Sequence, residues 1–240
     1  MSIKTSISDK LAAISNTEFQ YIETNDIAKL SELDTTASGI YMEASVIYFG
    51  IKNLAYIIKE NGRRKTVQTY DLYHAIITEI AASEGGFVNC YSPEGFLIIL
   101  PGNDADSKNA VNCGWKIAHA ITSTFKDHLS LISGIEFSMG IDHGHIMGNK
   151  NLSDNGLEHL SWFGPCICKA IRISMECLRP FYVGISSIVF HNLPEDMITT
   201  TRRILGIKKT VEYWSRVSYQ YENTKKHLYQ TNHKIDFEEQ

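Results

Sequence analysis

The stretch GGFVNCYSPEGFLIIL, residues 85–100, predicts a β-hairpin. Two glycines precede a first short strand, and residues 92–95, Ser-Pro-Glu-Gly, form a turn. The second strand is apolar and ends at Pro101 and Gly102. Glu94 therefore lies in a tight turn between two strands. This position suits either a solvated turn residue or a metal ligand, and both readings stay open.

The sequence around the hairpin predicts a succession of helices and strands. Periodicity indicates strands at 44–51, 135–149 (with a glycine bend and a return), 157–164, 181–186 and 210–217. Helices are expected at 66–83, 104–125, 165–178 and 187–193, the third starting with Pro165 at its first position. We expect an arm or helix at 1–40, one domain at 41–218 and a polar, fraying tail at 219–240. This order predicts an α/β fold, a single α/β or α+β sandwich.

The composition is that of a soluble globular protein. Of 240 residues, 43% are hydrophobic and 21% are charged, which is ordinary for this class. The net charge is -4 and the basic clusters 62–65 and 225–227 are short, so we expect no nucleic-acid partner. No apolar run is long enough to span a bilayer, so no membrane partner is expected. Five irregularly spaced cysteines favour reduced thiols and a cytoplasmic location.

Four motifs, in order, resemble those of the catalytic domain of class III nucleotidyl cyclases. They are IYFGIKN (47–53), GGFVNCYSPEG (85–95), GIDHG (140–144) and FGPCICKAIR (163–172), and GIKKTVEYW (206–214) resembles the closing strand. The resemblance covers roughly residues 40 to 217. It implies a ferredoxin-like fold, with helices packed on a mixed sheet. A weaker resemblance, through GIDHG and LSWFG, links the chain to bacterial pyrimidine cyclases of antiphage defence.

The resemblance implies a specific chemistry. In that family the ribose 3′-oxygen attacks the α-phosphate while two ions, Mg²⁺ or Mn²⁺, are held by two aspartates. Here Gly50 stands at the first aspartate position, as a lost ligand, and Glu94 stands at the second. The backbone carbonyl of Ile51 is a further metal-ligand candidate. Arg172 matches the arginine that stabilises the transition state, although an ordinary ion-paired helix arginine is the alternative.

The nucleotide-reading positions of the family are substituted in this chain. Cys90 stands at the base-reading lysine position, and Ser161 aligns with the base-reading aspartate of adenylyl cyclases. Cys168 replaces the asparagine that orients the ribose. These three residues are the candidates for contact with a nucleoside triphosphate.

Two histidines outside these motifs have two interpretations. His143 and His145 share one face of an expected strand. They suit a metal pair, but hydrogen-bonded structural histidines are the commoner outcome.

Three functions are compatible with this pattern. The motif losses favour a degenerate cyclase that dimerises, binds a nucleotide and has little or no cyclase activity alone. The alternatives are an active cyclase with unusual ligands, for example a pyrimidine cyclase making cCMP or cUMP in antiphage signalling, and one half of a heterodimer with an intact cyclase. We expect a homodimer, as the resemblance implies.

Overall fold

The computed structural model describes residues 2–16, 18–26, 29, 38–92, 94–129, 135–152, 158–204 and 207–236. The chain divides into two compact units. Residues 1–42 and 146–163 form the smaller unit, and residues 43–145 and 164–240 form the larger one. Pro93, in the predicted turn, lies outside the described residues. The predicted domain boundaries near 40 and 218 stay a prediction.

The smaller unit contains one helix and short strand pairs. Helix α1 (Ile3–Ser15) begins after Ser2, whose hydroxyl accepts a hydrogen bond from the Thr5 amide. Strand β1 (Gln20–Glu23) pairs in parallel with the first residues of β2 (Ser38–Ile51). Strand β6 (Glu158–Phe163) pairs antiparallel with the end of β5 (Phe137–Leu152). Within the predicted arm or helix at 1–40 the structure has helix α1, and within the predicted extended segment 157–164 it has β6.

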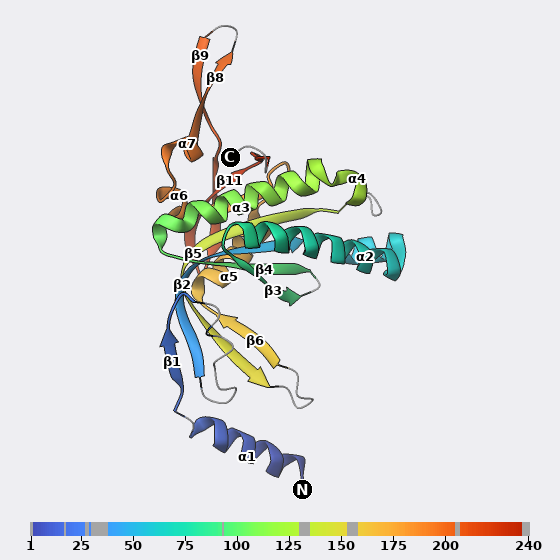
Figure 1. Cartoon of the computed structure of the whole chain (residues 1–240), viewed down its shortest axis with the longest axis vertical. Coiled ribbons are helices and arrows are strands. Elements are labelled where there is room, and N and C mark those ends of the chain that lie inside the picture. The colour runs from blue at the N-terminus through green and yellow to red at the C-terminus, as the bar shows by residue number, and fades with distance from the viewer. Residues whose placement is uncertain are drawn as a thin grey trace. The chain divides into compact units, whose positions relative to one another are not determined.

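The larger unit is built on a mixed sheet, in agreement with the predicted fold class (Figure 1). The strand order is β10-β11-β7-β5-β2-β4-β3. The further strands are β3 (Phe87–Ser92), β4 (Gly95–Pro101), β7 (Val183–Ser186), β10 (Ser215–Tyr221) and β11 (Thr224–Thr231). Strands β5 and β7 are parallel, whereas β2 and β3 run antiparallel to β4. A separate antiparallel ribbon consists of β8 (Thr199–Ile204) and β9 (Ile207–Glu212).

Helices cover both faces of this sheet. Helices α2 (Leu54–Ser83) and α3 (Ser107–His119) pack on one face, and α5 (Pro165–Glu176) packs on the other. Successive strand residues point to opposite faces. Ile141 and Val183 accordingly contact α3 at Gly114, while their neighbours Gly140 and Gly184 adjoin α5. Short helical segments complete the unit: η2 (Asp104–Asp106), a π-helix (Ala120–Thr124), α4 (Lys126–Leu129), α6 (Ser187–His191) and α7 (Glu195–Ile198).

An aromatic cluster holds the end of β2 in the core. The ring of Phe49 stacks on Phe137 with centroids 5.2 Å apart, and it also contacts Tyr73 of α2 and Phe96 of β4. All four side chains are buried. Because Phe49 faces α2, its neighbour Gly50 faces α5 on the opposite side of the sheet.

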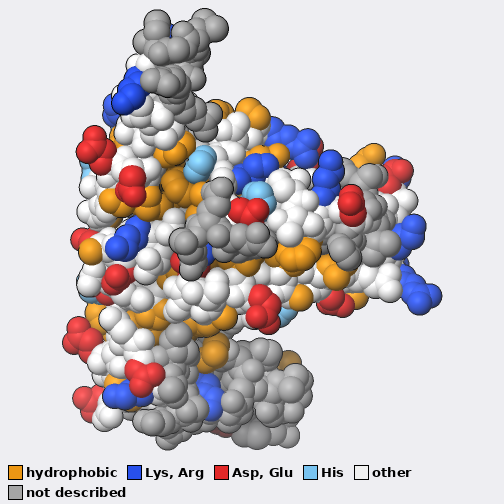
Figure 2. Space-filling view, turned by 45° about the horizontal axis from the view of Figure 1, so that its top comes forward, with side chains coloured by type: hydrophobic (Ala, Val, Ile, Leu, Met, Phe, Trp, Pro, Cys, Tyr) orange, Lys and Arg blue, Asp and Glu red, His pale blue; other side chains and the backbone are white. Residues whose placement is uncertain are grey.

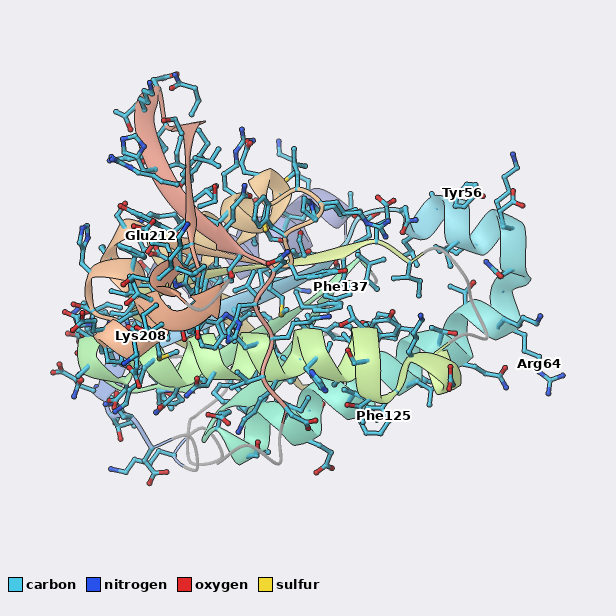
Figure 3. All side chains as sticks on the ribbon, turned by 90° about the horizontal axis from the view of Figure 1, so that it is seen from above. Tyr56, Arg64, Phe125, Phe137, Lys208 and Glu212 are labelled. Carbon is cyan, nitrogen blue, oxygen red and sulfur yellow. The ribbon has the colours of Figure 1, made fainter. Side chains whose placement is uncertain are left out.

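The surface of the described residues mixes charges of both signs (Figure 2). Exposed apolar side chains include Tyr56 and Val67 of α2, and Met175 and Leu178 at the end of α5. Arg64, near the kink that Gly62 introduces in α2, points away from the other elements (Figure 3). No helix in the described part of the chain is both long and apolar enough to cross a membrane.

Several secondary-structure predictions are wrong. The last strand is not 210–217, and the chain does not fray from 219: β10 and β11 continue the sheet, with Leu228 of β11 fully buried. Residues 135–149 do not turn back at the glycines but lie in one long strand, β5. Helix α2 consists of two helical segments on either side of Gly62, whose backbone angles (φ 76°, ψ 160°) are not helical. The predicted helix 66–83 lies in the second segment, and the first, from Leu54, was not predicted.

Candidate functional site

The hairpin turn and the end of β2 form one corner of the larger unit. Gly50 pairs with Gly95 across the two strands. The Ile51 amide donates a hydrogen bond to the Glu94 carbonyl at 2.7 Å. The structure therefore brings Gly50, Ile51 and Glu94 together, as the sequence predicted, and Glu94 is exposed there.

A pocket of about 420 Å³ opens beside this corner. Its lining comes from β2, the hairpin turn and α5: Tyr48, Gly50, Ile51, Lys52, Glu94, Ile171, Ser174 and Met175. Its volume lies within the range of about 300–1,000 Å³ that is usual for small-molecule sites. The corner is thus part of a pocket large enough for a ligand.

Ser174 occupies the space beside Gly50 where a side chain would begin. A Cβ atom added to Gly50 would lie 2.9 Å from the Ser174 hydroxyl oxygen. That hydroxyl donates to the Ser138 carbonyl at 3.1 Å, and the Ser138 hydroxyl donates to the Ser174 carbonyl at 2.7 Å. The serine pair ties α5 to β5 and leaves little room for a carboxylate at position 50.

Lys52 brings a positive charge to the pocket, and sequence analysis missed it. Its ammonium group donates a hydrogen bond to the Cys177 carbonyl just after α5. Burial lowers the pKa of Lys52, against the opposing influence of Cys177, Glu136 and Glu176. The sequence signal that could have identified Lys52 is its position two residues after Gly50. Lys52 and Glu94 are the charged side chains that line the pocket.

Arg172 faces a different hollow from Glu94. A second, more open pocket of about 520 Å³ is lined by Arg172 and by the β10–β11 turn, residues 220–223. Arg172 Nη2 lies 2.5 Å from Glu176 Oε1 on the same helix. Its Nε atom is buried and has no hydrogen-bond partner among the described residues. Cys168, one turn earlier, is exposed.

The structure does not test the remaining candidates, Ser161 and Cys90. Ser161 lies in β6, within the smaller unit. Cys90 is part of β3, and its side chain lies outside the described residues. Their proposed base-reading roles stay predictions.

Comparisons with known proteins identify the fold. No protein-family model matches the sequence, and no curated protein matches it significantly. Among solved structures, the guanylyl cyclase Cya2 matches with a TM-score of 0.66 at 12% identity, covering 84% of this chain and 97% of that chain. The chain has the class III nucleotidyl cyclase fold. This confirms the fold that the motifs implied.

Two further structures share this class III cyclase fold. A class III adenylyl cyclase-like ATP-binding protein from Pseudomonas aeruginosa has a TM-score of 0.65 at 11% identity, covering 80% of this chain and 44% of that chain. The non-canonical dimeric guanylyl cyclase domain of the RhoGC fusion protein from the aquatic fungus Blastocladiella emersonii has a TM-score of 0.59 at 16% identity, covering 81% and 99%.

The residues at the corner do not fit the two-ion centre that this cyclase fold implies. Two divalent ions need several oxygen ligands, usually including carboxylates. Glu94 is the carboxylate that lines the pocket, and the Lys52 ammonium lies in the same lining. A fixed ammonium group repels a divalent cation, so the corner lacks the charge that a pair of ions requires.

A buried carboxylate in the GIDHG motif was also missed. Asp142 of β5 is only 2% exposed, and its carboxylate lies 3.2 Å from the Lys169 ammonium of α5. Burial raises the pKa of Asp142, partly offset by Lys169 and by a hydrogen bond with Ser186. The Asp142–Lys169 pair joins α5 to β5, and we interpret it as a structural contact.

Proposed function

We propose that the chain is a cyclase-like protein that binds a nucleoside triphosphate and has little or no cyclase activity by itself. The observation that carries the proposal is that glycine occupies position 50, in a pocket where Glu94 is the single carboxylate among the described lining residues. The ion-dependent chemistry of the fold needs charge neutralisation that this lining does not offer.

The energetic loss is large. Each ion in a two-metal mechanism contributes several kcal/mol of transition-state stabilisation. Each loss of about 1.4 kcal/mol lowers a rate tenfold. Arg172 is in an ion pair with Glu176, so its charge is already partly neutralised. Arg172 cannot make up for the missing ligand.

Nucleotide binding is supported by the pocket itself. Its volume of about 420 Å³ suits a small molecule, and Lys52 supplies an ammonium group for a phosphate oxygen. One protein with this fold, from Pseudomonas aeruginosa, is described as adenylyl cyclase-like and ATP-binding. Nucleotide binding is therefore a role that suits this fold.

A dimer is the second part of the proposal. Glu94 and Arg172 line different pockets, so one copy of the chain does not place both at one reacting phosphate. In the family the resemblance implies, the site lies between two subunits, one supplying the carboxylates and the other the arginine. The Blastocladiella domain with this fold is described as dimeric. We propose a homodimer in the cytoplasm, where the free thiols of Cys113, Cys166, Cys168 and Cys177 stay reduced.

The test combines binding and turnover. The purified chain is incubated with Mn²⁺ and each of ATP, GTP, CTP and UTP, and products are detected by mass spectrometry. Binding of each nucleotide is measured by calorimetry with and without Mn²⁺. We expect binding of at least one nucleotide, weakened in Lys52→Ala, and little or no cyclic product. Robust turnover that Arg172→Ala abolishes would establish a working cyclase, and CTP or UTP as the substrate would make it a pyrimidine cyclase.

A heterodimer with an intact cyclase is the second candidate. It is favoured by Arg172, which lines an open pocket that a partner could cover. Arg172 is also the residue that matches a catalytic position of the cyclase family unchanged. In this case the chain raises the activity of a cyclase that has both aspartates. Co-purification with such a cyclase, and loss of the stimulation in Arg172→Ala, would support it over the homodimer.

A further inference from the structure

A second cluster of ligand-type side chains lies in the larger unit, away from the pocket. Glu43 of β2, Asp104 of η2 and His143 of β5 each direct one ligand atom into a common space, within 4.8 Å of one another. Glu43 is seven residues before Gly50, roughly 23 Å along the strand at about 3.3 Å per residue. We propose that this cluster binds a divalent first-row transition-metal cation such as Zn²⁺.

The distances fit a shared ion. His143 Nε2 lies 3.0 Å from Glu43 Oε1 and 3.1 Å from Asp104 Oδ1. Ligands at about 2.1 Å from a metal ion, on adjacent corners of its coordination shell, are about 3.0–3.4 Å apart. The three atoms therefore stand where neighbouring ligands of one ion stand, with small adjustments of the two carboxylates.

Hydrogen bonds engage both nitrogens of the His143 ring. Nε2–H donates to Glu43 Oε1 at 3.0 Å, and Nδ1 lies 2.9 Å from the Ser45 hydroxyl. When a cation takes the place of the Nε2 hydrogen, the ring hydrogen lies on Nδ1 and Ser45 can accept it. The Nε2 lone pair then faces the ion together with the two carboxylates. Metal-binding histidines are commonly oriented in this way by a partner on the second nitrogen.

Rigid elements hold the three side chains. The Gly102 amide donates to the Glu43 carbonyl at 3.1 Å, which fixes the turn before Asp104 against β2. A capping box formed by Asn103 and Asp106 orders the start of η2. His143 is only 5% exposed. A preformed site of this kind requires little ordering when an ion binds.

Access and charge also favour a cation. The Asp104 side chain is 63% exposed, so an ion can enter and keep solvent ligands. Within the described residues, His143 is the ion-pair partner of both carboxylates. Two negative charges therefore share one imidazole. The nitrogen ligand favours Zn²⁺ and its neighbours in the transition series over Mg²⁺ or Ca²⁺, which prefer oxygen.

The test is calorimetric titration of the nucleotide-free protein with ZnCl₂, and separately with CaCl₂. We expect one Zn²⁺ per chain and much weaker binding of Ca²⁺. Asp104→Asn and Glu43→Gln each remove one ligand without emptying the core and should weaken Zn²⁺ binding by at least about tenfold. Ser45→Ala removes the partner of Nδ1 and should weaken it about 10- to 100-fold. Asp71→Asn, which changes an exposed carboxylate elsewhere, should leave the affinity unchanged.

A spectroscopic readout separates an ion from a proton at Nε2. We expect the ¹⁵N resonance of His143 Nε2 to shift on addition of one equivalent of Zn²⁺ while Nδ1 carries the ring hydrogen. Equal affinity in wild type, Asp104→Asn and Glu43→Gln would overturn the proposal. So would a His143 spectrum that Zn²⁺ leaves unchanged, since it would show that both carboxylates pair with a protonated or Nε2–H ring. Neither outcome depends on nucleotide binding or on cyclase activity.

Discussion

At the residue scale, the candidate site is decided by a side chain that is missing. Gly50 faces α5, and the Ser174 hydroxyl lies where a side chain at position 50 would pass. A substitution of Gly50 alone therefore brings the new side chain too close to the Ser174 hydroxyl, and the hydrogen-bonded pair of Ser138 and Ser174 has to shift. Loss of the Ser174 hydroxyl removes one hydrogen bond, at a cost of about 1 kcal/mol.

The first prediction restores the lost ligand. Gly50→Asp with Glu94→Asp should give little activity while Ser174 remains, because its hydroxyl forces the new carboxylate away from the corner. Adding Ser174→Ala should raise cyclic-nucleotide formation in Mn²⁺ at least about tenfold above the wild-type level, equivalent to about 1.4 kcal/mol. Mass spectrometry of the products measures this. Equal product from the double and triple variants would show that Ser174 does not limit the corner.

The second prediction concerns ions at the corner. Because Glu94 and Lys52 carry opposite charges in one pocket lining, Mg²⁺ and Mn²⁺ should bind there at about millimolar concentrations or more weakly without nucleotide. Calorimetry on the Asp104→Asn protein avoids the separate cluster around His143. Tight binding of two ions that disappears in Glu94→Gln would contradict this prediction.

The third prediction follows from the buried carboxyl of Asp142. Burial raises its pKa above the unfolded value of about 3.9, so the folded chain holds this proton more tightly. Between the two pKa values the unfolded chain binds fewer protons, and the contribution of Asp142 to stability falls as pH rises. The free energy of unfolding, from urea titrations between about pH 4 and pH 7, should therefore fall more in wild type than in Asp142→Asn. A difference between the two proteins that does not change with pH would contradict this account.

At the element scale, α5 is the part that connects the sheet to both pockets. It packs so closely on β5 that a Cβ atom at Gly140 would overlap the Ala170 carbonyl oxygen and the Ser174 nitrogen. This contact gives a physical reason for glycine at the start of the GIDHG motif. Side chains of α5 line both the corner pocket and the pocket of Arg172.

The fourth prediction tests this packing. Gly140→Ala should lower the free energy of unfolding by about 3 kcal/mol, since backbone atoms on α5 have to move. Gly114→Ala is the matched control, because the new methyl meets the flexible end of Ile141 and alanine favours the helix by about 1 kcal/mol. Urea unfolding monitored by circular dichroism measures both. Similar stability in the two variants would show that α5 shifts without cost.

Local sequence patterns predicted the central elements but not the sheet's far edge. The hairpin of β3 and β4 has turn residues and apolar strands, and α5 has Pro165 at its first helical position, so both could be predicted. Strand β10 carries Val217, Tyr219 and Tyr221 in alternation, a signal that the sequence analysis missed. Strand β11 has no such alternation, and its place follows from long-range pairing with β7. Ser174 was missed because its place beside Gly50 depends on how α5 packs, and so does the pairing of Asp142 with Lys169. Lys52 could have been found from its position two residues after Gly50.

At the scale of the whole molecule, assembly decides whether the two pockets belong to one function. The apolar residues 96–100 of β4 are buried in the core of a single chain and are not available for an interface. The exposed apolar side chains at the end of α5 are instead Met175, 61% exposed, and Leu178, 62% exposed. Met175 lines the corner pocket, so an interface there would also cover the site.

The last prediction is that the chain forms a homodimer through this end of α5. Leu178→Glu puts a charge on the exposed apolar surface and should shift the protein towards a single chain at micromolar concentration, because a buried unpaired carboxylate is strongly unfavourable. Ile188→Glu, at an exposed position of α6, is the matched control and should leave the assembly unchanged. Light scattering coupled to gel filtration gives the mass of each protein. A wild-type mass of about one chain under these conditions would exclude the homodimer, and a dimer unchanged by Leu178→Glu would place its interface elsewhere on the molecule.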